Sequence, residues 1–187
     1  MRKILSLILI PFAALTLCSC FDYIEIEKSY IISALGFDMD ENAVRLSVEV
    51  ANGGEKRIFE AVGETILEAF QNIKKGFTRK PDFSHTACIV LGENFTQNMK
   101  YEALQFLKDV EGFAISARIV TAENALNLLE NEPRETAIGY DIIKLLEQNK
   151  VESIKLYETM DQKITTRPLL GFNEQGVFLL KGQVKKK

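Results

Sequence analysis

The sequence predicts an α+β fold in which a mixed β-sheet carries helices packed on it. Residues 30–62 show the apolar runs and the apolar–polar alternation of strands. After Gly63 the apolar period changes to the 3.6 residues of an amphipathic helix. Strand-like and helix-like segments then alternate as far as residue 150, which gives the order β-β-β-α-β-α-β-α-α. Because hairpins precede crossover units, we expect antiparallel and parallel strand pairs in one sheet.

The first three strands are predicted from local patterns and turn residues. Residues 30–37 form a near-continuous apolar run, which suits the middle of a sheet. Residues 44–50 alternate without a break between apolar and polar side chains, as in a half-buried strand. The acidic turn at 38–42 joins these two strands. A second turn at 52–55, which contains the hairpin signal Asn-Gly, then leads to a third strand at 57–62.

A helix is expected directly after Gly63. One helical face collects four apolar side chains, at Ile66, Phe70, Ile73 and Phe77. Thr65 and Glu68 have the spacing of a capping box, in which the two side chains satisfy free backbone N–H groups at the helix start. This spacing predicts that the helix begins immediately after Thr65.

Shorter elements follow this helix. They are a strand at 86–92, a helix at 99–110, a strand at 115–121, a short helix at 122–130 and a last helix at 138–146. The last helix carries Asp141 early and Lys144 late, as the helix dipole prefers. After residue 150 the pattern weakens to an extended stretch and one strand that begins at Gly176.

The N-terminus has the composition of an export signal. Arg2 and Lys3 precede a mostly apolar run at 4–17, which is shorter than the roughly 20 residues needed to span a membrane. A core helix is the alternative, but Pro11 lies in the middle of the run. No later stretch reaches 18 apolar residues. We therefore expect a signal peptide at residues 1–19.

The run closes on Leu17-Cys18-Ser19-Cys20, which resembles a bacterial lipobox. Cleavage before Cys20 removes Cys18, and the Cys20 thiol takes a diacylglycerol through a thioether. Residues 20–29 then form a lipid-anchored tether. With Cys20 acylated, Cys88 has no partner within the chain, so no disulfide is expected. Cys88 lies in an apolar, strand-like run and is predicted to be a small core residue.

The charge and the motif content argue against several classes of protein. The chain has 23 basic and 26 acidic residues; removing Arg2 and Lys3 with the signal leaves 21 basic residues and a net charge of −5. No nucleic-acid partner is expected from this composition. The single histidine, His85, precedes a strand and is expected to have a structural role. We expect no catalytic residue, no cofactor and no metal, because no cluster or motif for them occurs.

One acidic segment has a spacing that deserves a test. Asp38, Asp40, Asn42 and Glu49 occupy positions that bind calcium in an EF-hand loop. Ala43, however, replaces the glycine needed for the sharp turn, and the flanking segments are strands. We interpret the segment as a solvated acidic turn and calcium binding as the weaker alternative.

Several short motifs together resemble the C subunit of bacterial spore germinant receptors, the Ger(x)C lipoprotein family. The segment after the lipobox, "CFDYIEI" at 20–26, is similar to the family's "C-W-D-x-x-E-I", with phenylalanine for tryptophan. Residues 34–38 match its "A-L-G-x-D" strand end, and residues 60–73 its "G-x-T-x-x-E-A" helix start. Residues 83–95 match its histidine-to-"G-E" strand, and the likeness is collinear as far as residue 130.

The resemblance implies a lipid-anchored, non-catalytic receptor subunit. Such a protein would lie on the outer face of the spore inner membrane, assemble with the integral-membrane A and B subunits, and help couple nutrient sensing to germination. It also implies an N-terminal domain at 30–150 and the opening of a second, incomplete domain at 151–187. The alternatives are a solute-binding lipoprotein of a transporter and a non-functional truncated paralogue.

The segment next to the lipid is the candidate partner-binding site. Its residues are Phe21, Asp22, Glu25 and Ile26. An anchor at Cys20 would hold them beside membrane-embedded partners, so we expect the contact with the A and B subunits here.

Overall fold

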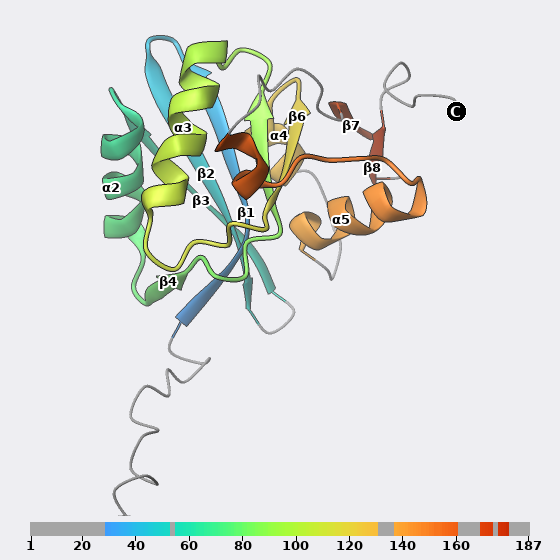
Figure 1. Ribbon diagram of the computed structural model, residues 1–187. Helices are drawn as coiled ribbons and strands as arrows, with labels where there is room; N and C mark the ends of the chain where they lie inside the picture. The colour runs from blue at the N-terminus through green and yellow to red at the C-terminus, as the bar shows by residue number, and fades with distance from the viewer. Residues whose placement is uncertain (1–28, 53–54, 131–136, 161–168, 174–175, 180–187) are drawn as a thin grey trace, which may run out of the picture.

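The fold is a β-sheet between two layers of helices, as seen in a computed structural model (Figure 1). The structure describes residues 29–52, 55–130, 137–160, 169–173 and 176–179. The strands are β1 (Ser29–Asp40), β2 (Ala43–Asn52), β3 (Glu55–Gly63), β4 (Lys80–Asp82), β5 (Cys88–Gly92), β6 (Arg118–Ala122), β7 (Leu169–Asn173) and β8 (Gly176–Leu179). The helices are α2 (Ile66–Gly76), α3 (Gln97–Asp109), α4 (Ala125–Glu130) and α5 (Ile138–Gln148), with a 3₁₀ turn, η2, at Leu156–Met160.

The sheet is mixed, as predicted. Its strand order is β3-β2-β1-β5-β6-β7-β8, and β4 pairs in parallel with the first residues of β1. The β1–β2, β2–β3 and β7–β8 pairs are antiparallel, whereas β1–β5, β5–β6 and β6–β7 are parallel. The predicted apolar strand thus becomes β1, which lies inside the sheet and is hydrogen-bonded on both edges.

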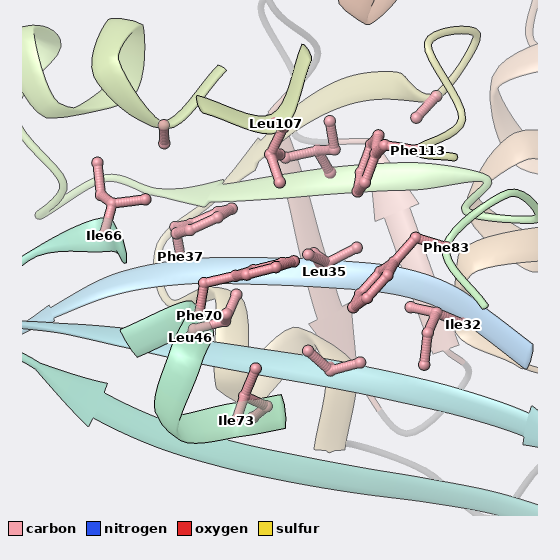
Figure 2. Close-up of a cluster of buried hydrophobic side chains, with 14 of the residues drawn as sticks. Ile32, Leu35, Phe37, Leu46, Ile66, Phe70, Ile73, Phe83, Leu107 and Phe113 are labelled. Carbon is pink, nitrogen blue, oxygen red and sulfur yellow. The ribbon is translucent and has the colours of Figure 1, made fainter. Parts of the chain in front are cut away.

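The larger hydrophobic core lies between the sheet and the helices α2 and α3 (Figure 2). Aromatic rings fill much of it: the Phe70 ring centroid lies 5.3 Å from that of Phe83 and 5.2 Å from that of Phe106. Ile66, Phe70 and Ile73 are buried on one face of α2, as the sequence predicts. Phe77 is different, because α2 ends at Gly76 and the Phe77 ring packs on Phe59 at 4.8 Å.

A second core lies on the opposite face of the sheet, under α4 and α5. Ala34, Val90 and Val120 from three neighbouring strands meet Leu129 of α4 and Ile142 of α5 there. We predicted residues 44–50 to be a half-buried strand, with one face toward solvent. Helices α4 and α5 cover that face of the sheet. That prediction was wrong for β2.

The error concerns two polar side chains of β2. Ser47 and Glu49 alternate with the apolar residues as predicted, yet they are 1% and 0% exposed. The physical reason is that α4 packs over β2 and Glu49 binds the start of α5. Buried partners account for Glu49, whose oxygens accept hydrogen bonds, whereas the buried Ser47 hydroxyl has no hydrogen-bond partner among the described residues.

Two segments joined the sheet without a clear sequence signal. β4 has only three residues and includes Pro81, so it lacks the length of a predictable strand. β7 pairs with β6 through Leu169 and Leu170, so the segment after residue 150 contributes strands to the same sheet. The division of the chain into domains at residue 150 stays a prediction.

Candidate functional site

The predicted anchor and partner-binding residues, Cys20, Phe21, Asp22, Glu25 and Ile26, lie outside the described residues. What the structure describes is the point at which the chain continues from them, the start of β1. Asn52 fixes this point: its Oδ1 accepts the Ile31 N–H at 2.8 Å, and its Nδ2 donates to the Ser29 carbonyl at 2.7 Å. The predicted tether therefore leads into a strand whose first residues are held by hydrogen bonds to Asn52.

Aromatic packing holds the same point from a second side. The Tyr30 ring lies 5.6 Å from both Phe59 of β3 and Phe77 after α2, and its hydroxyl is 3.0 Å from Thr78 Oγ1. The segments that surround the first residues of β1 are therefore a strand edge and the end of a helix, held in one cluster.

A buried carboxylate of β1 binds the start of α4. Asp38 is 1% exposed. Its Oδ1 accepts the Ala125 N–H and its Oδ2 the Leu126 N–H, both at 2.9 Å. A carboxylate is well suited to this place, because the first N–H groups of a helix have no partner within it and carry partial positive charge.

A second buried carboxylate, from β2, binds the start of α5 in the same way. Glu49 Oε1 accepts the Ile138 N–H at 2.8 Å, and Oε2 accepts the Gly139 N–H at 2.9 Å. Ser33 Oγ also donates to Oε2, at 2.7 Å. The N-cap residue of α5, Ala137, has no side chain that could do this. The cap of α5 therefore comes from the sheet.

These contacts show what two of the residues with calcium-like spacing bind in the folded protein. The oxygens of Asp38 and Glu49 are used by backbone N–H groups of two different helices, so they do not converge on one point. The interpretation as a solvated turn was wrong for Asp38, which is buried, although Glu41 is exposed. Within the part of the chain that the structure describes, no group of three or more His, Cys, Asp or Glu side chains is placed to hold a metal.

The motifs behind the family resemblance meet in the structure. Asp38 ends the "A-L-G-x-D" motif, and Gly92 belongs to the "G-E" motif of the strand beside it. A Cβ on Gly92 would lie 2.0 Å from Asp38 Oδ1, so only glycine leaves room for the carboxylate. Asn94, two residues after Gly92, also contacts the end of β1: its Nδ2 donates to the Met39 carbonyl at 2.9 Å. Two motifs that are distant in sequence thus form one packing unit at the carboxyl ends of β1 and β5.

The third motif caps α2, as predicted. Thr65 Oγ1 accepts the Glu68 N–H at 3.1 Å, and the Glu68 carboxylate accepts the Glu64 N–H at 2.8 Å. The described motif residues that we can assign are thus structural, and they position the helices on the sheet.

His85 lies at the surface. Its side chain is 61% exposed, and Nε2 is 3.9 Å from Asp82 Oδ2. Partial burial raises the pKa of Asp82, but hydrogen bonds from the hydroxyl and the backbone N–H of Ser84 outweigh it, and the pKa lies below its usual value. The Asp82–Ser84 turn leads into the loop before β5, and His85 follows it.

Cys88 is fully buried in β5, as predicted for a core residue. Burial raises the pKa of its thiol well above the usual value, and the nearby Glu49 charge adds to the shift. The thiolate is the reactive form, so this thiol is held inert.

We expect Cys88 to resist alkylation in the folded protein at pH 8. Maleimide labelling followed by peptide mass spectrometry should show no modified Cys88 until denaturant unfolds the domain. Rapid labelling of Cys88 in native conditions, at a rate like that of a free cysteine, would contradict the burial described here.

The fold and its motifs define a class: an α+β domain with a mixed sheet, in which buried carboxylates of the sheet bind the starts of α4 and α5. A family model described as the spore germination protein N-terminal domain matches residues 22–166. The chain therefore belongs to the family of spore germination proteins, the germinant receptor C subunits, through this N-terminal domain. Searches of curated proteins and of solved structures found no match.

The family sets the biological context at a coarse level. It is a family of non-catalytic receptor subunits in spore germination, associated with the spore membrane. Among the helices that the structure describes, none combines the length and apolar character that a bilayer crossing requires.

Proposed function

We propose that this protein is the lipid-anchored C subunit of a germinant receptor, which helps couple nutrient sensing to spore germination without catalysing a reaction. The observation that carries the proposal is the family match over residues 22–166, which begins two residues after Cys20 in the lipobox-like segment. The lipid on Cys20 would hold the domain on the outer face of the spore inner membrane.

The partners in this proposal are the integral-membrane A and B subunits. The segment with Phe21, Asp22, Glu25 and Ile26 would contact them, because it lies between the lipid and the ordered start of β1. The buried carboxylates support a non-catalytic role. Asp38 and Glu49 already accept hydrogen bonds from backbone N–H groups of this chain, so their role is structural rather than in binding a substrate.

Replacing Cys20 with alanine should release the protein from the membrane, because the residue that carries the acyl chains is lost. A single acyl chain holds a protein only marginally, so the proposal requires at least two chains on Cys20. Membrane fractionation with an antibody against the domain measures the release, and germination in response to nutrients should fall in the same strain.

The matched control is Cys18→Ala, in the segment that cleavage discards. This variant should stay with the membrane fraction and germinate normally. Retention of Cys20→Ala in the membrane fraction after the signal has been removed would contradict the anchor.

A further inference from the structure

The folded domain gathers positive charge at one corner. We call this the basic corner; its exposed residues are Arg57, Lys74, Lys75, Arg79 and Lys80. They come from the start of β3, the last turn of α2 and the segment leading into β4. Four of them fall within residues 74–80 of the sequence, and folding adds Arg57 from the start of β3.

Chain direction explains the gathering. β3 begins where β1 begins, since both are antiparallel to β2. α2 returns from the far end of β3, so its basic last turn comes back to this corner. Lys80 pairs with Ser29, the first residue of β1, and the Arg79 guanidinium lies 5.6 Å from the Tyr30 ring. Figure 1 shows β4 and the start of β1 together, at the end of the sheet away from the β1–β2 turn.

The opposite end of the sheet carries the other sign. The exposed residues Glu41, Glu64, Glu93 and Glu123 follow the ends of β1, β3, β5 and β6. The chain is acidic overall, with a formal net charge of −3. A basic corner on such a chain is therefore a matter of arrangement rather than of composition.

Acidic groups near the corner are fewer. Asp82 ends β4, and Asp109 and Glu111 lie at the last turn of α3 and just after it. Asp82 is already hydrogen-bonded to Ser84. Among the side chains that the structure describes, the five basic groups of the corner thus lie near three carboxylates, and Glu55, the first residue of β3, is a further acidic position at the same end of the sheet.

The position of the corner points to its occupant. Cys20 precedes Ser29 by nine residues, so even a fully extended tether keeps the start of β1 within about 30 Å of the acylated residue. Basic side chains close to a bilayer are attracted to anionic headgroups. We propose that the basic corner lies against the anionic lipid headgroups and turns the acidic end of the sheet away from the membrane. This inference rests on the proposed lipid anchor.

Lysine protection in the intact lipoprotein tests the proposal. The purified protein is inserted into vesicles of phosphatidylcholine alone, or of phosphatidylcholine mixed with phosphatidylglycerol, and treated with a membrane-impermeant amine-acylating reagent. Each basic residue near an anionic surface strengthens binding on the order of fivefold. Lys75 and Lys80 should therefore be exposed to the reagent for less of the time, and should react severalfold more slowly on the anionic vesicles. Lys144, 62% exposed on α5 at the other face of the sheet, should react equally on both. High salt should abolish the difference.

Matched variants make the test specific. In Lys75→Gln/Lys80→Gln the protection of Lys74 on anionic vesicles should be weaker, because two of the five basic residues are removed, whereas Lys144→Gln/Lys150→Gln should leave it unchanged. Neither pair touches a buried contact, so both proteins should fold.

The outcomes separate the two proposals. Flotation in a density gradient first shows whether the protein is bound to the vesicles. If it floats with neither kind of vesicle, the proposed anchor is wrong, and this inference is wrong with it. A protein that floats but shows equal labelling of Lys75 and Lys80 on both vesicles overturns the basic corner alone. Protection in native spore membranes but not on phosphatidylglycerol vesicles would assign the corner to a partner protein, which also overturns lipid contact.

Discussion

Replacing Glu49 with alanine should lower the free energy of unfolding by about 3–5 kcal/mol, because it leaves buried donors without an acceptor. The Ile138 and Gly139 N–H groups would lose the Glu49 oxygens that accept them, at 2.8 and 2.9 Å. Glu49 is 0% exposed, so water cannot replace it without opening the core. Denaturant unfolding followed by circular dichroism measures the change. Hydrogen exchange should show the loss first at the start of α5.

Two further variants define the cause. Glu49→Gln should lie between the wild type and alanine, because its amide keeps one acceptor oxygen but turns an NH₂ group toward an N–H. Glu60→Ala is the matched control on the neighbouring strand. The Glu60 side chain is 41% exposed and lies 3.8 Å from Arg45, so its loss should cost less than about 1 kcal/mol. Equal effects of Glu49→Ala and Glu60→Ala would contradict a capping role for Glu49.

Replacing Gly92 with alanine should lower the free energy of unfolding by about 2–4 kcal/mol, because the new methyl group displaces Asp38 from the start of α4. The added Cβ would lie 2.0 Å from Asp38 Oδ1 and 2.8 Å from Asn94 Oδ1. Asp38 cannot move away freely, since two backbone N–H groups of α4 hold it. Thermal or denaturant unfolding measures the effect.

A double-mutant cycle identifies the contact. In an Asp38→Ala background the carboxylate is absent, so Gly92→Ala should cost much less than in the wild type. Gly76→Ala is the control, because nothing lies within 4 Å of its added Cβ. Placed at the end of α2, it should be neutral or stabilise the protein by up to about 1 kcal/mol. Additive effects of Asp38→Ala and Gly92→Ala would show that the two residues do not act together.

Local patterns predicted the elements whose causes are local. The alternation of residues 44–50 specified β2, and the Thr65–Glu68 spacing specified the start of α2. β4 was missed because three residues carry too little pattern. The helix face was extended to Phe77 because its spacing fits a helix, whereas the ring packs outside α2 on Phe59 and Tyr30.

The surroundings of polar residues could not be predicted in the same way. Asp38 meets residues 87 and 88 positions later, and Glu49 residues 89 and 90 positions later. Acidic residues in a turn and in an alternating strand are ordinarily solvated, so their sequence context indicated water. Only the packing of α4 and α5 on the sheet made them helix caps.

Most of the strands and helices, the lipobox-like segment at Cys20 and the family could be predicted from the sequence, because each is written in contiguous residues or in short motifs in a fixed order. The tertiary structure decided what the motif residues do and where the charges lie. Gly92 leaves space for Asp38, Glu49 caps a helix from another part of the chain, and Arg57 joins the basic residues of 74–80 where β1 and β3 begin and α2 ends. These features depend on contacts between distant segments, and such contacts exist only after the sheet has brought the segments together.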